Sequence, residues 1–160
     1  MNHLIAQKDT DIFPFPLEFR IINEELEFVI DYLGKNGITE YSWNFSRRFL
    51  VPKDELSFRV ASQLDPIDSL FLSAIIKDFG HIIEDSRLLQ DLQIVFGYRF
   101  SPSEDGKLYK PGRQWKKYWQ KNKSLNEQYS VALKTDISDF YNQIYHHTLE
   151  NTITQIGAPN

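Results

Sequence analysis

The sequence predicts an α+β fold in which helices dominate and short extended regions supply the strands. Three observations support this prediction: a capped amphipathic helix over 66–85, a hairpin pattern over 41–59, and an apolar run over 129–135 that leads into another helix. The length of 160 residues favours one domain with its own core.

The first 40 residues predict an N-terminal helical extension. Residues 9–16 contain two prolines two positions apart, which disfavour both a helix and a central strand, so this stretch is expected to be irregular. A helix is expected from Pro16 or Asn23 to Leu33, where Asn23 can cap the main turns and Gly34 ends the helix. Apolar spacing predicts its buried face: Ile22, Leu26, Val29, Ile30 and Leu33.

Residues 41–59 predict a β-hairpin. Aromatic and β-branched side chains over 41–51 favour a strand that ends at Pro52. A charged turn at 53–55 follows, and a second extended run starts near Leu56 and passes through Arg59.

The clearest helix start in the sequence is Asp65-Pro66-Ile67-Asp68. The Asp65 carboxylate can accept a free amide hydrogen of the first turn, and Pro66 fits the first helical position because its missing N–H is not needed there. Asp68 adds negative charge at the positive end of the helix dipole. Apolar residues then recur at helical spacing to about Asp85, so this helix is expected to be core scaffold.

The second half of the chain predicts two further helices and one strand. An extended run over 92–100 and a loop over 101–106 precede a short helical pattern over 113–121. The apolar run Tyr129–Thr135 is predicted to be a buried strand that leads into Asp136. A helix is expected from about Asp139 to Ile156.

Composition excludes several classes of protein. The chain is 41% hydrophobic, 25% charged and 14% aromatic, which is typical of a soluble globular protein. No run approaches the roughly 20 apolar residues of a membrane span, and no secretory signal is visible. Cysteine is absent, which excludes disulfides, thiolate metal sites and a cysteine nucleophile. We therefore expect a cytoplasmic protein with no membrane partner.

The net charge of −4 conceals a concentrated positive segment over 107–126, which holds seven basic and no acidic residues. Four aromatic residues are interleaved with these cations. Cations neutralise phosphates and aromatic rings stack on bases, so the segment predicts a surface for single-stranded or hybrid nucleic acid. The basic residues are Lys107, Lys110, Arg113, Lys116, Lys117, Lys121 and Lys123.

An alternative interpretation of this segment is structural. Trp115 and Trp119 share one face of the predicted helix and can anchor it to the core, while the lysines only solvate the outer side. We expect both interpretations to hold in part, with the tryptophans mostly in the core and the lysines mostly on template or product.

The segment Val131–Ile144 carries the strongest chemical signal, because it places Asp136 at the end of an apolar strand. Carboxylates on rigid elements hold the divalent cations that phosphoryl transfer requires. The alternative is that Asp136 and Asp139 merely cap the following helix and offset its dipole.

This segment resembles motif A of reverse transcriptases, which consists of a hydrophobic strand, an aspartate, and then paired aromatics and isoleucine. The resemblance implies that Asp136 is the first catalytic aspartate and binds Mg²⁺ together with Ile137. It further implies that Asp139 and Phe140 lie under the incoming deoxynucleoside triphosphate. Tyr141 matches the steric gate of the family, whose ring fills the space of a ribose 2′-hydroxyl and selects deoxynucleotides.

A second resemblance lies upstream, where Arg48–Lys53, then Arg59, then the helix start at Asp65 are similar to the fingers of bacterial reverse transcriptases. It implies that Lys53 and Arg59 contact the triphosphate of the incoming nucleotide. A guanidinium fork and a mobile ammonium suit that role. The alternative is a surface hairpin with ordinary solvated charges, but the two motifs occur in the order of the family.

Residues 44–155 as a whole resemble the abortive-infection and defence-associated reverse transcriptases of bacteria. The resemblance implies helix-rich fingers over 41–128, with a basic insertion at 97–126, and the start of a right-hand polymerase palm over 129–160. It implies Mg²⁺ as cofactor, and as partners an RNA template, a DNA product, deoxynucleoside triphosphates and the remaining palm and thumb. A homo-oligomer is left open, and the implied role is RNA-directed DNA synthesis in antiviral defence.

The Tyr-x-Asp-Asp motif of the family does not occur after Asp136 in these 160 residues. One aspartate cannot hold two magnesium ions, so we expect the chain not to polymerise alone and to be a truncated form or one part of a split protein. His146, His147 and Glu150 are expected to be exposed helix residues, since no third metal ligand is evident. Two other functions stay open: an inert nucleic-acid-binding module and a helical protein-interaction domain.

Overall fold

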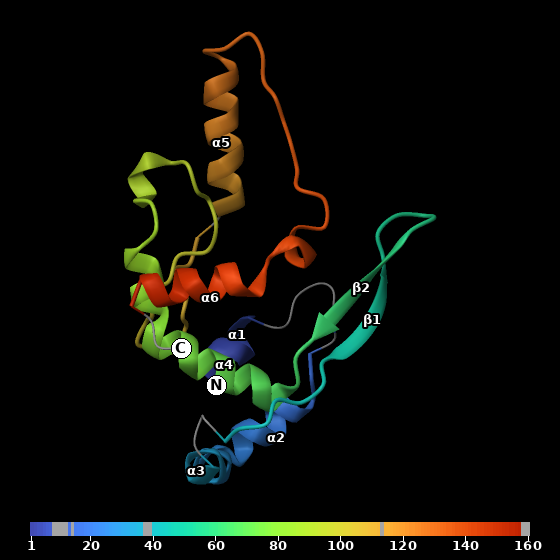
Figure 1. Cartoon of the computed structure of the whole chain (residues 1–160), viewed down its shortest axis with the longest axis vertical. Helices are drawn as coiled ribbons and strands as arrows, with labels where there is room; N and C mark the ends of the chain where they lie inside the picture. The colour runs from blue at the N-terminus through green and yellow to red at the C-terminus, as the bar shows by residue number, and fades with distance from the viewer. Residues whose placement is uncertain (8–12, 14, 37–39, 113, 158–160) are drawn as a thin grey trace. The chain divides into compact units, whose positions relative to one another are not determined.

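The computed structural model contains α-helices, short 3₁₀ helices and a two-stranded antiparallel sheet, which confirms the α+β class (Figure 1). The chain divides into two compact units. The first comprises Met1–Ile76 with Glu104–Lys107, and the second comprises Lys77–Ser103 with Leu108–Asn160. The structure describes residues 1–7, 13, 15–36, 40–112 and 114–157.

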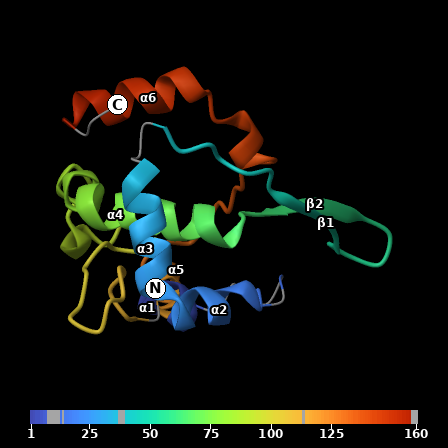
Figure 2. The same ribbon diagram turned by 90° about the horizontal axis from the view of Figure 1, so that it is seen from below.

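The first unit begins with the helices α1 (Asn2–Gln7), α2 (Glu18–Glu24) and α3 (Leu26–Asn36). Phe19 and Ile22 of α2 are buried. Figure 2 shows that α2 and α3 run in different directions, with the change at Glu25.

The predicted N-terminal helix is wrong in several details: α2 and α3 replace the single helix, and Ile30 of its predicted buried face is 59% exposed. Asn23 lies inside α2 rather than at a cap, and Gly34 lies inside α3 rather than after it. A glycine costs a helix only about 1 kcal/mol, and the exposed pair Asp31–Lys35 (2.6 Å) spans it from one turn to the next. The predicted irregular stretch at 9–16 falls largely outside the described residues.

The predicted hairpin is confirmed as β1 (Arg47–Pro52) and β2 (Phe58–Gln63), with Val51 opposite Arg59. The Asp54 carboxylate organises the turn, because it accepts hydrogen bonds from the Leu56 and Ser57 amides (2.9 and 2.8 Å). The hydrogen bonds from Ser57 and Leu56 also hold the pKa of Asp54 below its usual value.

The helix α4 (Pro66–Asp85) begins as predicted, since Asp65 Oδ1 accepts the Ile67 amide hydrogen at 3.0 Å. Asp68 adds more than a charge near the helix dipole, because its side chain is fully buried. Its Oδ1 accepts from the Tyr41 hydroxyl (2.5 Å) and the Asn44 side-chain amide (3.3 Å), and its Oδ2 accepts from the Asn44 backbone amide (3.0 Å). The Tyr41 ring stacks on Phe71, which belongs to α4 as Asp68 does (4.3 Å between ring centroids).

These contacts explain why the first strand is shorter than predicted. Tyr41 and Asn44 belong to the segment expected to be extended, but β1 starts only at Arg47. The carboxylate of Asp68 offers the backbone of Asn44 a buried, charged acceptor, and this hydrogen bond replaces a strand hydrogen bond there.

Tyr41 predicts a loss of stability in alkali. Burial, together with the hydrogen bond to Asp68, raises the pKa of its phenol far above the ordinary 10.0. Because the pKa of Tyr41 is higher in the folded chain than in the unfolded chain, its contribution to stability is fully present below about pH 10. This contribution declines at higher pH, since the unfolded chain then releases a proton that the folded chain keeps. Urea unfolding between about pH 8 and 11 is expected to show this decline, and to show a shallower one in Tyr41→Phe. Equal declines in the two proteins would contradict the prediction.

The second unit contains the C-terminal part of α4 together with η1 (Gln90–Leu92), α5 (Gln114–Asn126), η2 (Phe140–Gln143) and α6 (His146–Gln155). The predicted extended run over 92–100 is mostly irregular, and only Phe100 forms an isolated bridge, with Tyr109. The predicted basic helix is confirmed as α5 and extends to Asn126. No helix in the described part of the chain is both long and apolar enough to cross a membrane.

The predicted buried strand Tyr129–Thr135 is wrong in this structure. These residues form no strand, and the side chains of Val131 and Leu133 are 83% and 89% exposed. A strand requires a neighbour that satisfies its backbone groups, and the strands described here, β1 and β2, pair only with each other.

The single helix predicted from Asp139 to Ile156 is interrupted. Asp139 adopts a left-handed φ of 54°, η2 follows it, and Ile144 and Tyr145 are extended before α6 begins. His147 is 96% exposed and lies 3.5 Å from Glu150, so these side chains are solvated, as expected.

A candidate nucleic-acid interface

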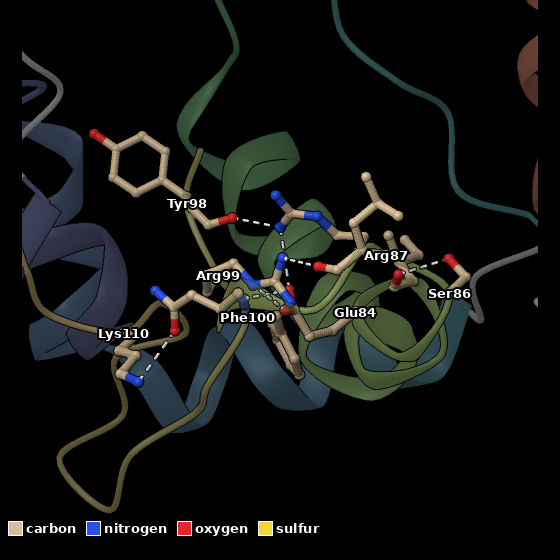
Figure 3. Close-up of polar contacts among 10 residues, drawn as sticks. Glu84, Ser86, Arg87, Tyr98, Arg99, Phe100 and Lys110 are labelled. Atoms are coloured by element: carbon tan, nitrogen blue, oxygen red, sulfur yellow. Dashed lines mark hydrogen bonds and ion pairs between the residues drawn. The ribbon is translucent and has the colours of Figure 1, made fainter. Parts of the chain in front are cut away.

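The position of the basic segment in the second unit depends on Glu84, near the end of α4. Its carboxylate pairs with Arg99 Nε, binds Arg87 Nη1 at 3.1 Å and accepts the Phe100 amide hydrogen at 2.9 Å (Figure 3). Arg99 also donates to the Leu88 carbonyl at 2.9 Å. Arg87 Nη1 also donates to the Tyr98 carbonyl, so residues 98–100 are attached to α4 and its C-terminal end by charged hydrogen bonds, which are stronger than neutral ones.

Gly80 of α4 also permits the attachment of Phe100 to this helix, because it has no side chain. A Cβ atom at this position would lie 2.6 Å from the Phe100 ring, which is closer than side chains tolerate. The ring therefore rests directly on the backbone of α4.

The attached segment in turn positions Lys110. The Ser101 amide donates to the Leu108 carbonyl and the Lys110 amide donates to the Arg99 carbonyl, both at 2.9 Å. Leu108 is 5% exposed and anchors the second arm of this pairing. The Lys110 ammonium reaches Gln90 Oε1 at 3.4 Å (Figure 3).

Lys110 and residues of α5 line an open pocket of about 770 Å³. Lys117 and Lys121 are its lysines from α5, and their spacing of four residues places them on one face of the helix. We call this the lysine pocket. Asp91 is the acidic residue in its lining, which therefore holds three cations and one carboxylate.

A second pocket, of about 570 Å³, lies on the neighbouring face of α5 and is largely aromatic. Its lining includes Phe96, Tyr98, Trp115 and Tyr118, and we call it the aromatic pocket. Trp115 stacks on Tyr118 with ring centroids 5.5 Å apart and planes 19° apart.

The expectation that the tryptophans belong to the core is wrong. Trp115 is 70% exposed and Trp119 is 46% exposed. These rings contact Tyr118 and each other rather than a packed interior, and Lys134 Nζ lies 5.7 Å from the centroid of Trp119.

The other predicted nucleic-acid-binding residues lie in different places. Lys107 belongs to the first unit and pairs with Asp105 at 2.5 Å, while Arg113 falls outside the described residues. Lys116 lines the aromatic pocket, and Lys123 is exposed on α5 away from the linings of both pockets.

The predicted triphosphate contacts, Lys53 and Arg59, lie on the hairpin of the first unit. The Lys53 amide donates to the Ser57 carbonyl at 2.9 Å, so the strand register continues one pair beyond Pro52. Arg59 is opposite Val51, and side chains two apart on a strand share a face. The register therefore places Lys53 and Arg59 on one face of the hairpin.

The remaining predicted site residues, 136–141, lie in the second unit. Asp136 and Ile137 lie in irregular chain, with Ile137 63% exposed. Asp139 Oδ1 accepts a hydrogen bond from the Asn142 side-chain amide at 2.6 Å. Phe140 and Tyr141 form η2 and contact each other edge to face, with Tyr141 85% exposed.

The described residues do not fit the predicted magnesium site by themselves. No group of three or more His, Asp or Glu side chains among them is arranged to hold a metal ion. The Asp139 carboxylate is engaged by Asn142, and Asp136 offers a single carboxylate. A pair of hard cations needs more oxygen ligands than this segment supplies.

Sequence reasoning missed the residues that assemble the interface. Glu84 and Phe96 carry no local signal, because their roles depend on contacts with distant segments. The spacing of Gln114, Lys117 and Lys121 along a helix does predict one polar face beside the aromatic one.

Comparison with protein-family models, with curated proteins and with solved structures finds no match to this chain.

Proposed function

We propose that these residues form the fingers and the beginning of the palm of a bacterial reverse transcriptase, which adds deoxynucleotides to a DNA strand on an RNA template in antiviral defence. The observation that carries the proposal is the hairpin. Its register puts Lys53 and Arg59 on one face, and the capped helix α4 follows directly. Two cations on a rigid arm suit the triphosphate of a nucleotide.

The segment 136–141 supports the same proposal through its residue types. Asp136 supplies a carboxylate, and Tyr141, five residues after it, supplies a bulky ring of the kind that would exclude a ribose 2′-hydroxyl. The further carboxylates that a magnesium pair needs would come from a paired-aspartate strand of the polymerase. The 160-residue chain alone is therefore expected to incorporate no nucleotide.

A second candidate function is a nucleic-acid-binding module without catalysis. The observation that favours it is the lysine pocket, with three cations and one carboxylate in its lining. This module would bind strands but would show no selective affinity for deoxynucleoside triphosphates.

Binding of dTTP to the 160-residue chain tests the triphosphate role of the hairpin. We expect Arg59→Gln to weaken binding about tenfold, because a charge-assisted hydrogen bond to phosphate is lost. Arg48→Gln is the matched control, since it removes the same charge from the same hairpin but on the opposite face. Equal losses in the two variants, measured by titration calorimetry, would contradict a specific triphosphate contact.

Primer extension on an RNA template tests the polymerase assignment. It requires a polypeptide that contains these residues together with a paired-aspartate strand. We expect incorporation of deoxynucleotides in preference to ribonucleotides, and absence of any incorporation would leave the binding module as the better assignment.

A further inference from the structure

The lysine pocket and the aromatic pocket adjoin, because Phe96 and Gln114 line both of them. Lys117 and Lys121 lie on one face of α5, and Trp115 and Tyr118 lie on the next face round the helix. A ligand that crosses this boundary meets cations on one side and aromatic rings on the other. The contributions of Lys117, Lys121, Trp115 and Tyr118 keep a fixed order, because these residues belong to one helix.

The lysine pocket has the chemistry of a phosphodiester site. Three ammonium groups and one carboxylate leave an excess of two positive charges in its lining. Lys110 comes from the segment attached to Glu84, whereas Lys117 and Lys121 come from α5, so two separate segments supply cations to this lining. The contact from Lys110 to Gln90 is long, at 3.4 Å, and a phosphate oxygen can replace it at little cost.

The aromatic pocket has the chemistry of a base site. Trp115 uses one side of its ring to stack on Tyr118 and is still 70% exposed. A nucleobase can extend this stack, and every base offers a flat face for it. Stacking in this way requires an unpaired base, because the bases of a duplex are already stacked on each other.

We propose that these two pockets bind an unpaired nucleic-acid strand, with a phosphate held between Lys110, Lys117 and Lys121 and a neighbouring base stacked on Trp115. The inference rests on the proposed function for the role of that strand as template or product, but binding itself needs neither Asp136 nor Arg59. An acidic peptide would use the lysine pocket without the aromatic one, and it serves as an alternative outcome of the test.

Fluorescence anisotropy with labelled oligo(U) and oligo(dT) of about ten nucleotides tests the proposal in the 160-residue chain, without magnesium or nucleotides. The double variant Lys117→Gln, Lys121→Gln is expected to bind at least about tenfold more weakly. The slope of log affinity against log salt concentration is expected to be smaller in magnitude by about 1.4 in this variant. Each phosphate contact on a single strand contributes about 0.7 to the slope, and the variant loses two lysines. Trp115→Ala is expected to lose about tenfold in affinity while the salt slope stays unchanged.

The matched control is Lys35→Gln, Lys77→Gln, which removes the same charge from exposed helical positions that line neither pocket. It is expected to change affinity by less than about threefold. Circular dichroism confirms that each variant is folded. The proposal would be overturned if the control double variant lost as much affinity as the pocket double variant, or if Trp115→Ala had no effect. It would also be overturned if a duplex bound as tightly as a single strand, or if a poly-glutamate peptide competed as effectively as oligo(U).

The experiment separates this inference from the proposed function. If the chain shows no selective dTTP binding but Arg59→Gln still binds a single strand, the interface is supported and the polymerase assignment is rejected. Selective dTTP binding without strand binding would reject the interface alone. A preference between oligo(U) and oligo(dT) identifies which strand the pockets take.

Discussion

Asp68→Ala is expected to lower the free energy of unfolding by about 2–3 kcal/mol. The substitution removes a fully buried carboxylate that accepts three hydrogen bonds, and hydrogen bonds to charged groups contribute about 1.5–3 kcal/mol each. Much of their sum is offset, because the variant no longer bears the cost of burying a charge. It also leaves the Tyr41 hydroxyl, half-buried beside Phe71, without its acceptor. Urea unfolding followed by tryptophan fluorescence reports on this region, since Trp43 contacts both Tyr41 and Phe71.

Asp78→Ala is the control for that measurement. Asp78 is an exposed acidic residue of the same helix, and substitutions at such positions usually stay within about 0.5 kcal/mol. Asp68→Asn should fall between the two, because an amide oxygen still accepts from Tyr41 while the charge is lost. A change for Asp68→Ala as small as that for Asp78→Ala would show that the hydrogen bonds to Tyr41 and Asn44 do not stabilise the fold.

Glu84→Ala is expected to destabilise the second unit by about 3 kcal/mol. Its carboxylate neutralises Arg99 and Arg87, whose side chains are 10% and 27% exposed, and it also holds the Phe100 amide. Removal of one partner from a buried ion pair leaves the other charge uncompensated, which costs about 3–5 kcal/mol, and the partial exposure of Arg87 puts the value at the low end. Chemical denaturation followed by far-ultraviolet circular dichroism measures the change.

A sharper comparison is Glu84→Gln against Asp85→Asn. Each removes one negative charge from the last turn of α4, but Asp85 is exposed. Glu84→Gln should destabilise and Asp85→Asn should not. Similar unfolding midpoints for the two would mean that the general charge of the helix end matters and that the ion pairs with Arg99 and Arg87 do not.

The parts of the fold that the sequence predicts are those governed by neighbouring residues. The start of α4 depends on Asp65 and Pro66, and the hairpin depends on a turn of a few residues around Asp54, so both were predicted correctly. Tyr41 and Asn44 contact Asp68 from 27 and 24 positions away, and that contact overrides the strand preference of their own segment. No local pattern reveals such a partner.

The candidate site follows the same division. The clustering of lysines on a helix with aromatic neighbours is visible in the sequence, and α5 carries it. Which lysines act together is not visible, because Lys110 reaches the lysine pocket only through the pairing of 99–101 with 108–110 and through Glu84. The tryptophans were expected in a core because their apolar area usually favours burial, but Trp115 is 70% exposed and Trp119 is 46% exposed.

The hydrogen bond between Glu84 and Phe100 also determines how the length of the chain between these two residues affects stability. Glu84 and Phe100 are 16 residues apart and close a loop whose intervening residues are otherwise mostly irregular. The entropy of closing a flexible loop grows only with the logarithm of its length, so doubling it costs about 0.6 kcal/mol. Insertions between η1 and Phe96 would therefore alter the shape of the lysine pocket at little thermodynamic cost, so the lining of this pocket can change without loss of the fold.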